Sequence, residues 1–194
     1  MYLLTKVVLA IMLGFITSAI LGLIMGPLLK RLGIGQNVSQ YVGMRHQKKA
    51  GTPTMGGLIF ILATIIVITF LLLTNKIDFT YDLKIVFFVF VSYSIIGFLD
   101  DYLSIKRGKN EGLTIVQKLL LQLVVALVFF YLYIKAGGQT SLIVSTLGIH
   151  IEMKWLYGLF ILFILVGSSN AVNLTDGLDG LAAGLSAIAF IAFS

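Results

Sequence analysis

Residues 83–101 read LKIVFFVFVSYSIIGFLDD, a largely apolar run of membrane-spanning length that ends on two adjacent aspartates, Asp100 and Asp101. Charge close to hydrocarbon is costly and is retained mainly where it has a function. Two other polar clusters interrupt the apolar sequence, one at 48–57 and one at 170–180. All three are predicted on the same side of a membrane, which indicates a membrane enzyme with its site at that face.

The composition makes a lipid bilayer the solvent of this chain. Hydrophobic residues form 59% of the 194 residues, charged residues only 11%, and the mean hydropathy is +1.05. A water-soluble domain of this length has too little interior to bury so much apolar surface. No apolar run alternates with the period of two expected for strands. We therefore predict an all-α, polytopic membrane protein, with residues 1–194 forming a single integral membrane domain.

Six stretches are long enough, or nearly so, to cross a bilayer, which takes about 20 residues. They lie near Leu3–Met25, Met55–Thr74, Leu83–Leu99, Ile115–Ile134, Trp155–Val172 and Leu178–Ser194. Six crossings place the connections at 26–54, 100–114 and 173–177 on one side, and those at 75–82 and 135–154 on the other. With the adjoining helix ends, the first side carries nine of the 14 basic residues: Lys30, Arg31, Arg45, Lys48, Lys49, Lys106, Arg107, Lys109 and Lys118. This excess predicts that the first side is cytoplasmic and that the N-terminus is outside.

Other features of the composition narrow the class of protein. The net charge of +6 fits membrane orientation and anionic lipid or phosphate substrates better than nucleic acid. The first stretch lacks a basic leader region and a small-residue cleavage site, so we expect a retained helix rather than a signal peptide. The chain has no cysteine, which excludes disulfides, thiolate metal sites and a cysteine nucleophile.

The adjacent aspartates are the first candidates for chemistry. Neighbouring helical residues point about 100° apart, so both carboxylates can face one point only if the helix ends there. The basic tail that follows favours such an end. Two carboxylates could then hold Mg²⁺, which is commonly bound by one or two carboxylates plus substrate phosphates, or one could act as a general base. The alternative is an acidic pair at the interface, balanced by Lys106 and Arg107.

The cluster at 48–57 has the composition of an anion-binding loop. Its lysines and threonines precede glycines that allow close approach of backbone amides, at the start of a predicted helix whose free N–H groups favour an anion. The candidate residues are Lys49, Thr52 and Thr54. The alternative is an ordinary capped loop with Thr52 or Thr54 as the N-cap. The lysine precedes the glycines, so this is not a Walker P-loop.

The third cluster repeats a polar residue at every third position. Its members are Asn170, Asn173, Asp176 and Asp179, and on a helix this spacing keeps near neighbours on one slowly turning face. Amides and carboxylates here could hold a metal and bind a polar base or sugar. The alternative, a short turn between two helices, needs only one or two polar residues. Lys118, near the start of the fourth stretch, could reach an anionic substrate or extend to lipid phosphates.

These motifs together resemble a known family. GTPTMGG at 51–57, the aspartate pair at 100–101 and NAVNLTDGLDG at 170–180 are similar, in this order, to the phospho-N-acetylmuramoyl-pentapeptide transferases. That family belongs to the polyprenyl-phosphate N-acetylhexosamine-1-phosphate transferases. The aspartate pair is common to the wider group, whereas the TPTMGG form favours the muramoyl-pentapeptide branch.

The resemblance implies a reaction in peptidoglycan synthesis at the bacterial plasma membrane, and hence a role in cell wall formation, cell shape and division. Phospho-N-acetylmuramoyl-pentapeptide would pass from UDP-N-acetylmuramoyl-pentapeptide to undecaprenyl phosphate, giving lipid I and UMP, with Mg²⁺ as the cofactor. It also implies roles for residues. Asp100 and Asp101 would be catalytic and, with Asn173, would hold the metal. The substrate-binding residues would be Lys49, Thr52, Thr54, Lys118, Asn170, Asn173, Asp176 and Asp179.

The resemblance also sets three further expectations. The family has about ten transmembrane helices, so we expect this chain to be an N-terminal part that is inactive by itself. A homodimer is another family expectation. Two competing interpretations stay open: a sister enzyme that uses UDP-N-acetylglucosamine, and a non-catalytic membrane fragment. A transporter fits less well, because its polar residues should recur at mid-membrane depth.

Overall fold

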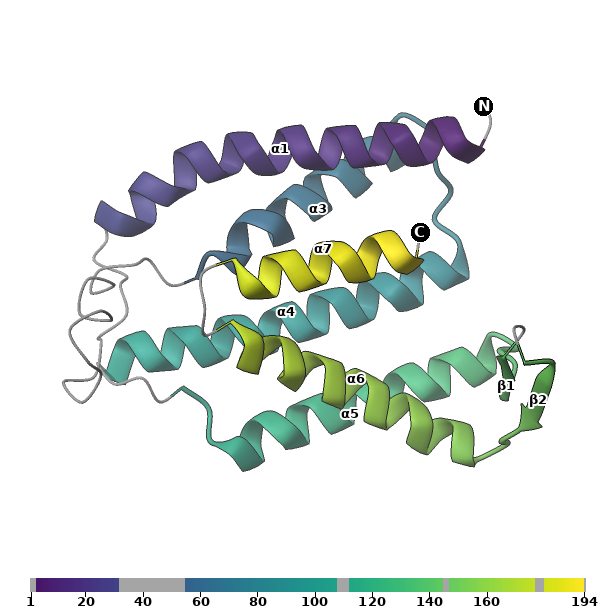
Figure 1. The fold of residues 1–194 in the computed structure, drawn as a ribbon. Helices are drawn as coiled ribbons and strands as arrows, with labels where there is room; N and C mark the ends of the chain where they lie inside the picture. The colour runs from purple at the N-terminus through teal and green to yellow at the C-terminus, as the bar shows by residue number, and fades with distance from the viewer. Residues whose placement is uncertain (1–2, 32–54, 108–111, 145–146, 177–179, 194) are drawn as a thin grey trace. The chain divides into compact units, whose positions relative to one another are not determined.

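The computed structural model describes residues 3–31, 55–107, 112–144, 147–176 and 180–193. Within these ranges there are six α-helices and one two-stranded sheet (Figure 1). The helices are α1 (Leu3–Arg31), α3 (Gly57–Leu73), α4 (Tyr81–Arg107), α5 (Ile115–Lys135), α6 (Leu156–Thr175) and α7 (Leu181–Phe193). The strands are β1 (Ser141–Val144) and β2 (Ile149–Glu152), which lie in the connection between α5 and α6. The predicted all-α fold class is confirmed.

Four of these helices, α1, α4, α5 and α6, are long and apolar enough to cross a membrane. The chain is therefore a multi-pass membrane protein. Helix α3, with 17 residues, and α7, with 13, are shorter apolar helices. Helical structure follows from the solvent, because hydrocarbon offers no partner for backbone N–H and C=O groups and a helix pairs them internally. This outweighs the weak helix propensity of the β-branched residues that are frequent in α3.

Two helices extend further than the sequence predicted. Helix α1 continues past Met25, through Pro27, to Arg31. Helix α4 continues past the aspartate pair to Arg107, so the prediction that it ends at Asp100 and Asp101 is wrong. No glycine or proline occurs between 101 and 107, and the basic residues of the last turn stabilise the negative end of the helix dipole. The two aspartate side chains therefore leave α4 about 100° apart.

The chain divides into two compact units, Met1–Lys118 and Leu119–Ser194. In the first unit α1 packs along α3, and α3 contacts α4. In the second unit α6 contacts α7, and β1 pairs with β2 in antiparallel register. The single-domain organisation stays a prediction.

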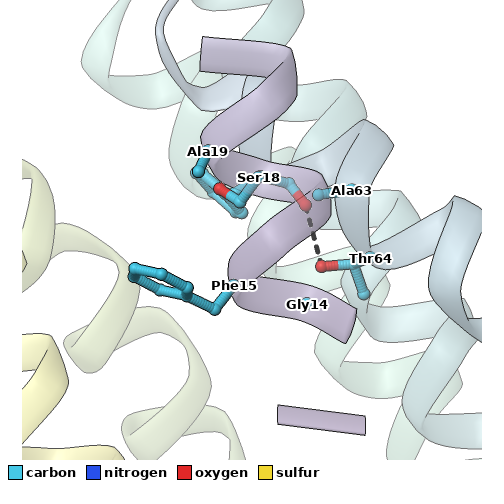
Figure 2. Close-up of a pocket in the computed structure, with 7 residues that line it drawn as sticks. Gly14, Phe15, Ser18, Ala19, Ala63 and Thr64 are labelled. Atoms are coloured by element: carbon cyan, nitrogen blue, oxygen red, sulfur yellow. Dashed lines mark hydrogen bonds between the residues drawn. The ribbon is translucent and has the colours of Figure 1, made fainter. Parts of the chain in front are cut away.

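Small residues line the contact between α1 and α3. A pocket of about 420 Å³ is bordered by Gly14, Phe15, Ser18 and Ala19 of α1 and by Phe60, Ala63 and Thr64 of α3. Figure 2 shows this pocket in close-up. The hydroxyl of Thr64 donates to the carbonyl oxygen of Phe60 at 2.8 Å, so its hydrogen bond stays within α3. The Phe15 ring points away from Thr64 in this view. Small side chains are what allow membrane helices to approach closely.

In the second unit, α5 and α6 meet where a glycine faces a phenylalanine ring and where one aromatic pair stacks. Gly158 of α6 is buried, and a Cβ atom added there would lie 2.7 Å from Cε1 of Phe130 on α5. One turn further along α5, the Tyr133 ring stacks on Tyr157 of α6 with centroids 5.9 Å apart. The missing side chain at position 158 is therefore what admits the Phe130 ring between the two helices.

Replacing this glycine should weaken the α5–α6 contact. We expect Gly158→Ala to lower the melting temperature of the detergent-purified chain, because overpacking of this kind costs about 1–3 kcal/mol. Gly167→Ala is the matched control, since it lies on the same helix with nothing within 4 Å of the added atom. There alanine should stabilise by up to about 1 kcal/mol through helix propensity. Adding Phe130→Leu to the Gly158→Ala variant should restore part of the lost melting temperature, because the smaller side chain makes room for the added methyl group. Equal shifts at both glycines would contradict the close contact.

Candidate functional site

Asp100 is fixed at the junction of α4 and α5 by two partners. Its Oδ2 forms an ion pair with Nζ of Lys118 at 2.8 Å, and its Oδ1 accepts a hydrogen bond from the backbone N–H of Leu113 at 2.8 Å. The two charged side chains are 18% and 22% exposed. Partial burial strengthens their attraction relative to a surface pair, and it makes loss of either partner more costly. The sequence predicted roles for Asp100 and Lys118 separately but did not predict that they pair.

The segment before α5 is shaped to bring this pair together. Thr114 and Gln117 form a capping box, in which the N–H of Gln117 donates to the Thr114 hydroxyl at 3.2 Å and the N–H of Thr114 donates to Oε1 of Gln117 at 3.1 Å. Arg107, at the end of α4, donates to the carbonyl oxygen of Gly112 at 2.7 Å. A Cβ atom at Gly112 would overlap the carbonyl oxygen and Oδ1 of Asp100, so only glycine allows this close approach.

Asp100 is a poor metal ligand in this arrangement. Both of its oxygens are engaged, and a dication there would compete with the Lys118 ammonium group. Among the residues that the structure describes, no three His, Cys, Asp or Glu side chains are grouped to hold a metal ion. Mg²⁺ does not need such a group, because one or two carboxylates with water and substrate phosphates suffice. The exposed carboxylate of Asp176 fits that chemistry, and the metal-binding roles of Asp101 and Asn173 stay predictions.

A second polar group lies between α5 and α6. Gln122 of α5 is only 1% exposed, and its Nε2 donates to Oγ of Ser169 at 3.1 Å. Asn170 of α6 donates through Nδ2 to Oε1 of Gln122 at 2.8 Å and to the carbonyl oxygen of Val166 at 2.8 Å. Both N–H groups of Asn170 are therefore used inside the protein. This arrangement suits a residue that joins two helices, and its substrate-binding role stays a prediction.

Asn173 and Asp176 lie where α6 ends. Both are exposed, Asn173 in the last helical turn and Asp176 as the C-cap, whose N–H donates to the carbonyl oxygen of Val172. The four polar residues of this cluster do not share one helix, because α6 ends at Thr175 and Asp179 lies outside the described residues. Gly180, which precedes α7, has φ +79°, a conformation that favours glycine.

Most of the cluster at 48–57 lies outside the described residues, including Lys49, Thr52 and Thr54. Its described end shows how α3 begins. Gly56 is the N-cap, so neither threonine holds that position. Met55 is buried and has φ 64°, a left-handed conformation that is uncommon for a residue with a side chain. Its carbonyl oxygen accepts the N–H of Leu58 at 3.0 Å, which closes the turn into α3.

The Asp100–Lys118 pair joins α4 to the start of α5, and Asn173 and Asp176 lie at the end of α6. Comparison with known families covers all of these elements. The model described as glycosyl transferase family 4 matches residues 83–194, more than half of the chain. The chain belongs to glycosyl transferase family 4. In addition, residues 49–61 match phospho-N-acetylmuramoyl-pentapeptide-transferase signature 1. The resemblance drawn from the three motifs is confirmed.

Curated relatives carry the same name. The chain is 45% identical over 188 residues to a phospho-N-acetylmuramoyl-pentapeptide-transferase of Geobacillus sp. (strain WCH70), with 96% of this chain and 57% of the relative covered. It is 42% identical over 193 residues to that of Oceanobacillus iheyensis, covering 98% and 59%. It is 42% identical over 185 residues to that of Bacillus subtilis (strain 168), covering 95% and 56%. The chain therefore spans a little over half the length of these relatives.

The buried amides should be coupled energetically. We expect Gln122→Met to lower the stability of the purified chain by about 1–3 kcal/mol, because it leaves a donor of Asn170 without its buried acceptor. The double variant Gln122→Met/Asn170→Leu should lose less stability than the sum of the losses in the two single variants, because it leaves neither buried amide without its partner. Thermal unfolding of the four proteins in one detergent measures this coupling. Additive losses would show that the two side chains do not interact.

Proposed function

We propose that this chain serves the transfer of phospho-N-acetylmuramoyl-pentapeptide from its UDP conjugate to undecaprenyl phosphate, giving lipid I and UMP. The observation that carries the proposal is the Asp100–Lys118 pair fixed beside the connection between α4 and α5, in a chain that also has the transferase signature at 49–61. A lipid acceptor and a water-soluble donor can meet only at a membrane surface. The polar segment where α4 ends and α5 begins suits such a place.

The proposed chemistry exchanges one phosphorus–oxygen bond for another. An oxygen of the lipid phosphate attacks the sugar-linked phosphorus of the UDP donor. The bond from that phosphorus to the bridging oxygen breaks, and UMP leaves with the electron pair. A phosphate monoester carries a charge of about −1.5 to −2 at pH 7, so the attack brings two anions together. The protein must therefore neutralise charge and fix geometry more than it must supply a reactive side chain.

The arrangement around Asp100 supports a division of labour between the aspartates. We assign Asp100 to holding the Lys118 ammonium group in place, because both carboxylate oxygens have partners in the chain. Lys118 would then face a substrate phosphate. From the family resemblance, Asp101 and Asn173 stay proposed Mg²⁺ ligands, and Asp176 a proposed substrate-binding residue. When bound, Mg²⁺ would neutralise charge on the donor diphosphate.

Other parts of the proposal rest on the family resemblance and the basic-residue count. We place the site on the cytoplasmic face of a bacterial plasma membrane, with the N-terminus outside. Lys49, Thr52, Thr54 and Asp179 are proposed donor-binding residues, and a homodimer is proposed as the assembly. UDP-N-acetylmuramoyl-pentapeptide is the proposed donor because the chain matches the signature named for that transferase.

Binding of the donor tests the proposed site, because this chain is expected to be inactive by itself. We expect the chain, in vesicles lacking other transferases, to bind UDP-N-acetylmuramoyl-pentapeptide when Mg²⁺ is present and to release no UMP. Asp101→Asn should weaken this binding about 10-fold or more, because interactions with a charged group are worth about 1.5–3 kcal/mol. Asp82→Asn is the control, an exposed aspartate in the first turn of the same helix. No binding, or equal binding by both variants, would overturn the proposal.

The positive charge at position 118 can be tested in the same binding assay. Lys118→Met should weaken donor binding about 10-fold or more, whereas Lys118→Arg should retain much of it, because arginine can still pair with a carboxylate and face a phosphate. Lys106→Met is the control, an exposed basic residue in the last turn of α4. A similar loss in Lys106→Met would mean that general positive charge, and not the Asp100–Lys118 pair, supports donor binding.

A further inference from the structure

The hairpin formed by β1 and β2 has one apolar and one largely polar face. The register pairs Leu142 with Ile151 and Val144 with Ile149, and side chains of directly paired residues project to the same face. These four residues define the apolar face. The other face carries Ser141, Ile143, His150 and Glu152. Ile143 is thus the one apolar strand residue on the polar face.

The apolar face lacks a full cover within its own unit of the chain. Ile149 and Ile151 are 42% and 48% exposed, and Leu142 and Val144 are half-buried. A two-stranded hairpin by itself is marginally stable in water and needs its apolar face to pack against something. The hairpin therefore requires a surface that the described residues of the second unit do not supply.

The hairpin is held close to the ends of two membrane helices. The Tyr133 hydroxyl, on α5, donates to the carbonyl oxygen of Gln139 at 2.8 Å, and the same ring stacks on Tyr157 of α6. The N–H of Met153 donates to the carbonyl oxygen of Thr140 at 3.0 Å, which extends the pairing below β1 and β2. Only three residues separate Glu152 from Leu156, so the strand base lies within about 14 Å of α6 by chain length.

The residues around these helix ends are those of a lipid headgroup region. Trp155 is 72% exposed and Tyr131 is 64% exposed, and such amphipathic rings prefer the membrane–water interface. Lys135 and Lys154 flank the hairpin on either side and can reach lipid phosphates. The hairpin is therefore tethered at the depth where an apolar face meets acyl chains and a polar face meets water.

We propose that the apolar face of the β1–β2 hairpin lies in the interfacial layer of the bilayer, as an anchor beside α5 and α6. A second copy of the chain is a weaker occupant, because each side of a stable protein interface buries about 800 Å² over about 20–30 residues. The two strands provide eight residues, of which four form the apolar face. This inference rests on the membrane-spanning helices and is independent of the proposed transferase activity.

The absence of cysteine allows a direct test. Single-cysteine variants Ile151→Cys and Ile143→Cys compare the same residue type, at similar exposure of 48% and 55%, on opposite faces. Each 194-residue chain is labelled with an environment-sensitive nitrobenzoxadiazole fluorophore and placed in phosphatidylglycerol–phosphatidylcholine vesicles. Lipids with a spin label near the headgroup quench probes in the interface, and iodide quenches probes in water.

We expect the probe at position 151 to emit at shorter wavelength and to be quenched at least twofold more by the spin-labelled lipid than the probe at position 143. Iodide, in contrast, should quench the probe at position 143 more than the probe at position 151. Ile149→Cys and His150→Cys repeat the comparison on adjacent residues, so the test stands if one variant misfolds. Equal quenching on both faces would overturn the anchor. Protection of position 151 from both quenchers would also overturn it, because protein would then cover the apolar face.

Discussion

The structure depends on one constraint: within hydrocarbon, every polar group must find its hydrogen-bond partner in the chain itself. The backbone meets it by forming helices. The hydroxyl groups of Thr64, Thr74 and Ser94 meet it by donating to carbonyl oxygens of their own helices. Gln122 cannot do so alone, and it pairs with Ser169 and Asn170 across the α5–α6 contact. Helix contacts in the second unit are therefore specified by polar pairing as well as by the close fit at Gly158.

The same constraint separates two kinds of polar residue in the candidate site. Asp100, Lys118 and Asn170 are partly buried and have partners within the protein, so they determine where neighbouring elements lie. Asn173 and Asp176 are exposed at the end of α6, where water or a ligand can meet them. A residue of the first kind influences a reaction by positioning others, and one of the second kind by contact. Sequence motifs contain both kinds without distinguishing them.

The helical class and the positions of the apolar runs could be predicted from the sequence, because both follow from the apolar composition and from the length of each run. The prediction misplaced the end of α4, because it takes the basic residues after the aspartates to mark the end of the helix, although no glycine or proline occurs between 101 and 107. The short connection between α4 and α5 could have indicated that Asp100 and Lys118 approach each other, because closely linked helix ends are neighbours in space. Gln122, a lone amide in the run LLLQLVVALVFF, was a missed signal of the same sort. The β1–β2 hairpin depends on pairing between two short segments, which a search for membrane-length runs does not detect.

Helix α6 relates the two membrane surfaces through its length. Its 20 residues span about 30 Å, which equals the thickness of a typical hydrocarbon core, about 30 Å. One end is tied through Tyr157 to the base of the hairpin, and the other carries Asn173 and Asp176. The helix therefore has no spare length to absorb hydrophobic mismatch by tilting. In a bilayer a few ångströms thicker, either the lipid must thin locally or the polar end of α6 must enter hydrocarbon. Bilayer thickness thus sets the depth at which Asn173 and Asp176 meet water.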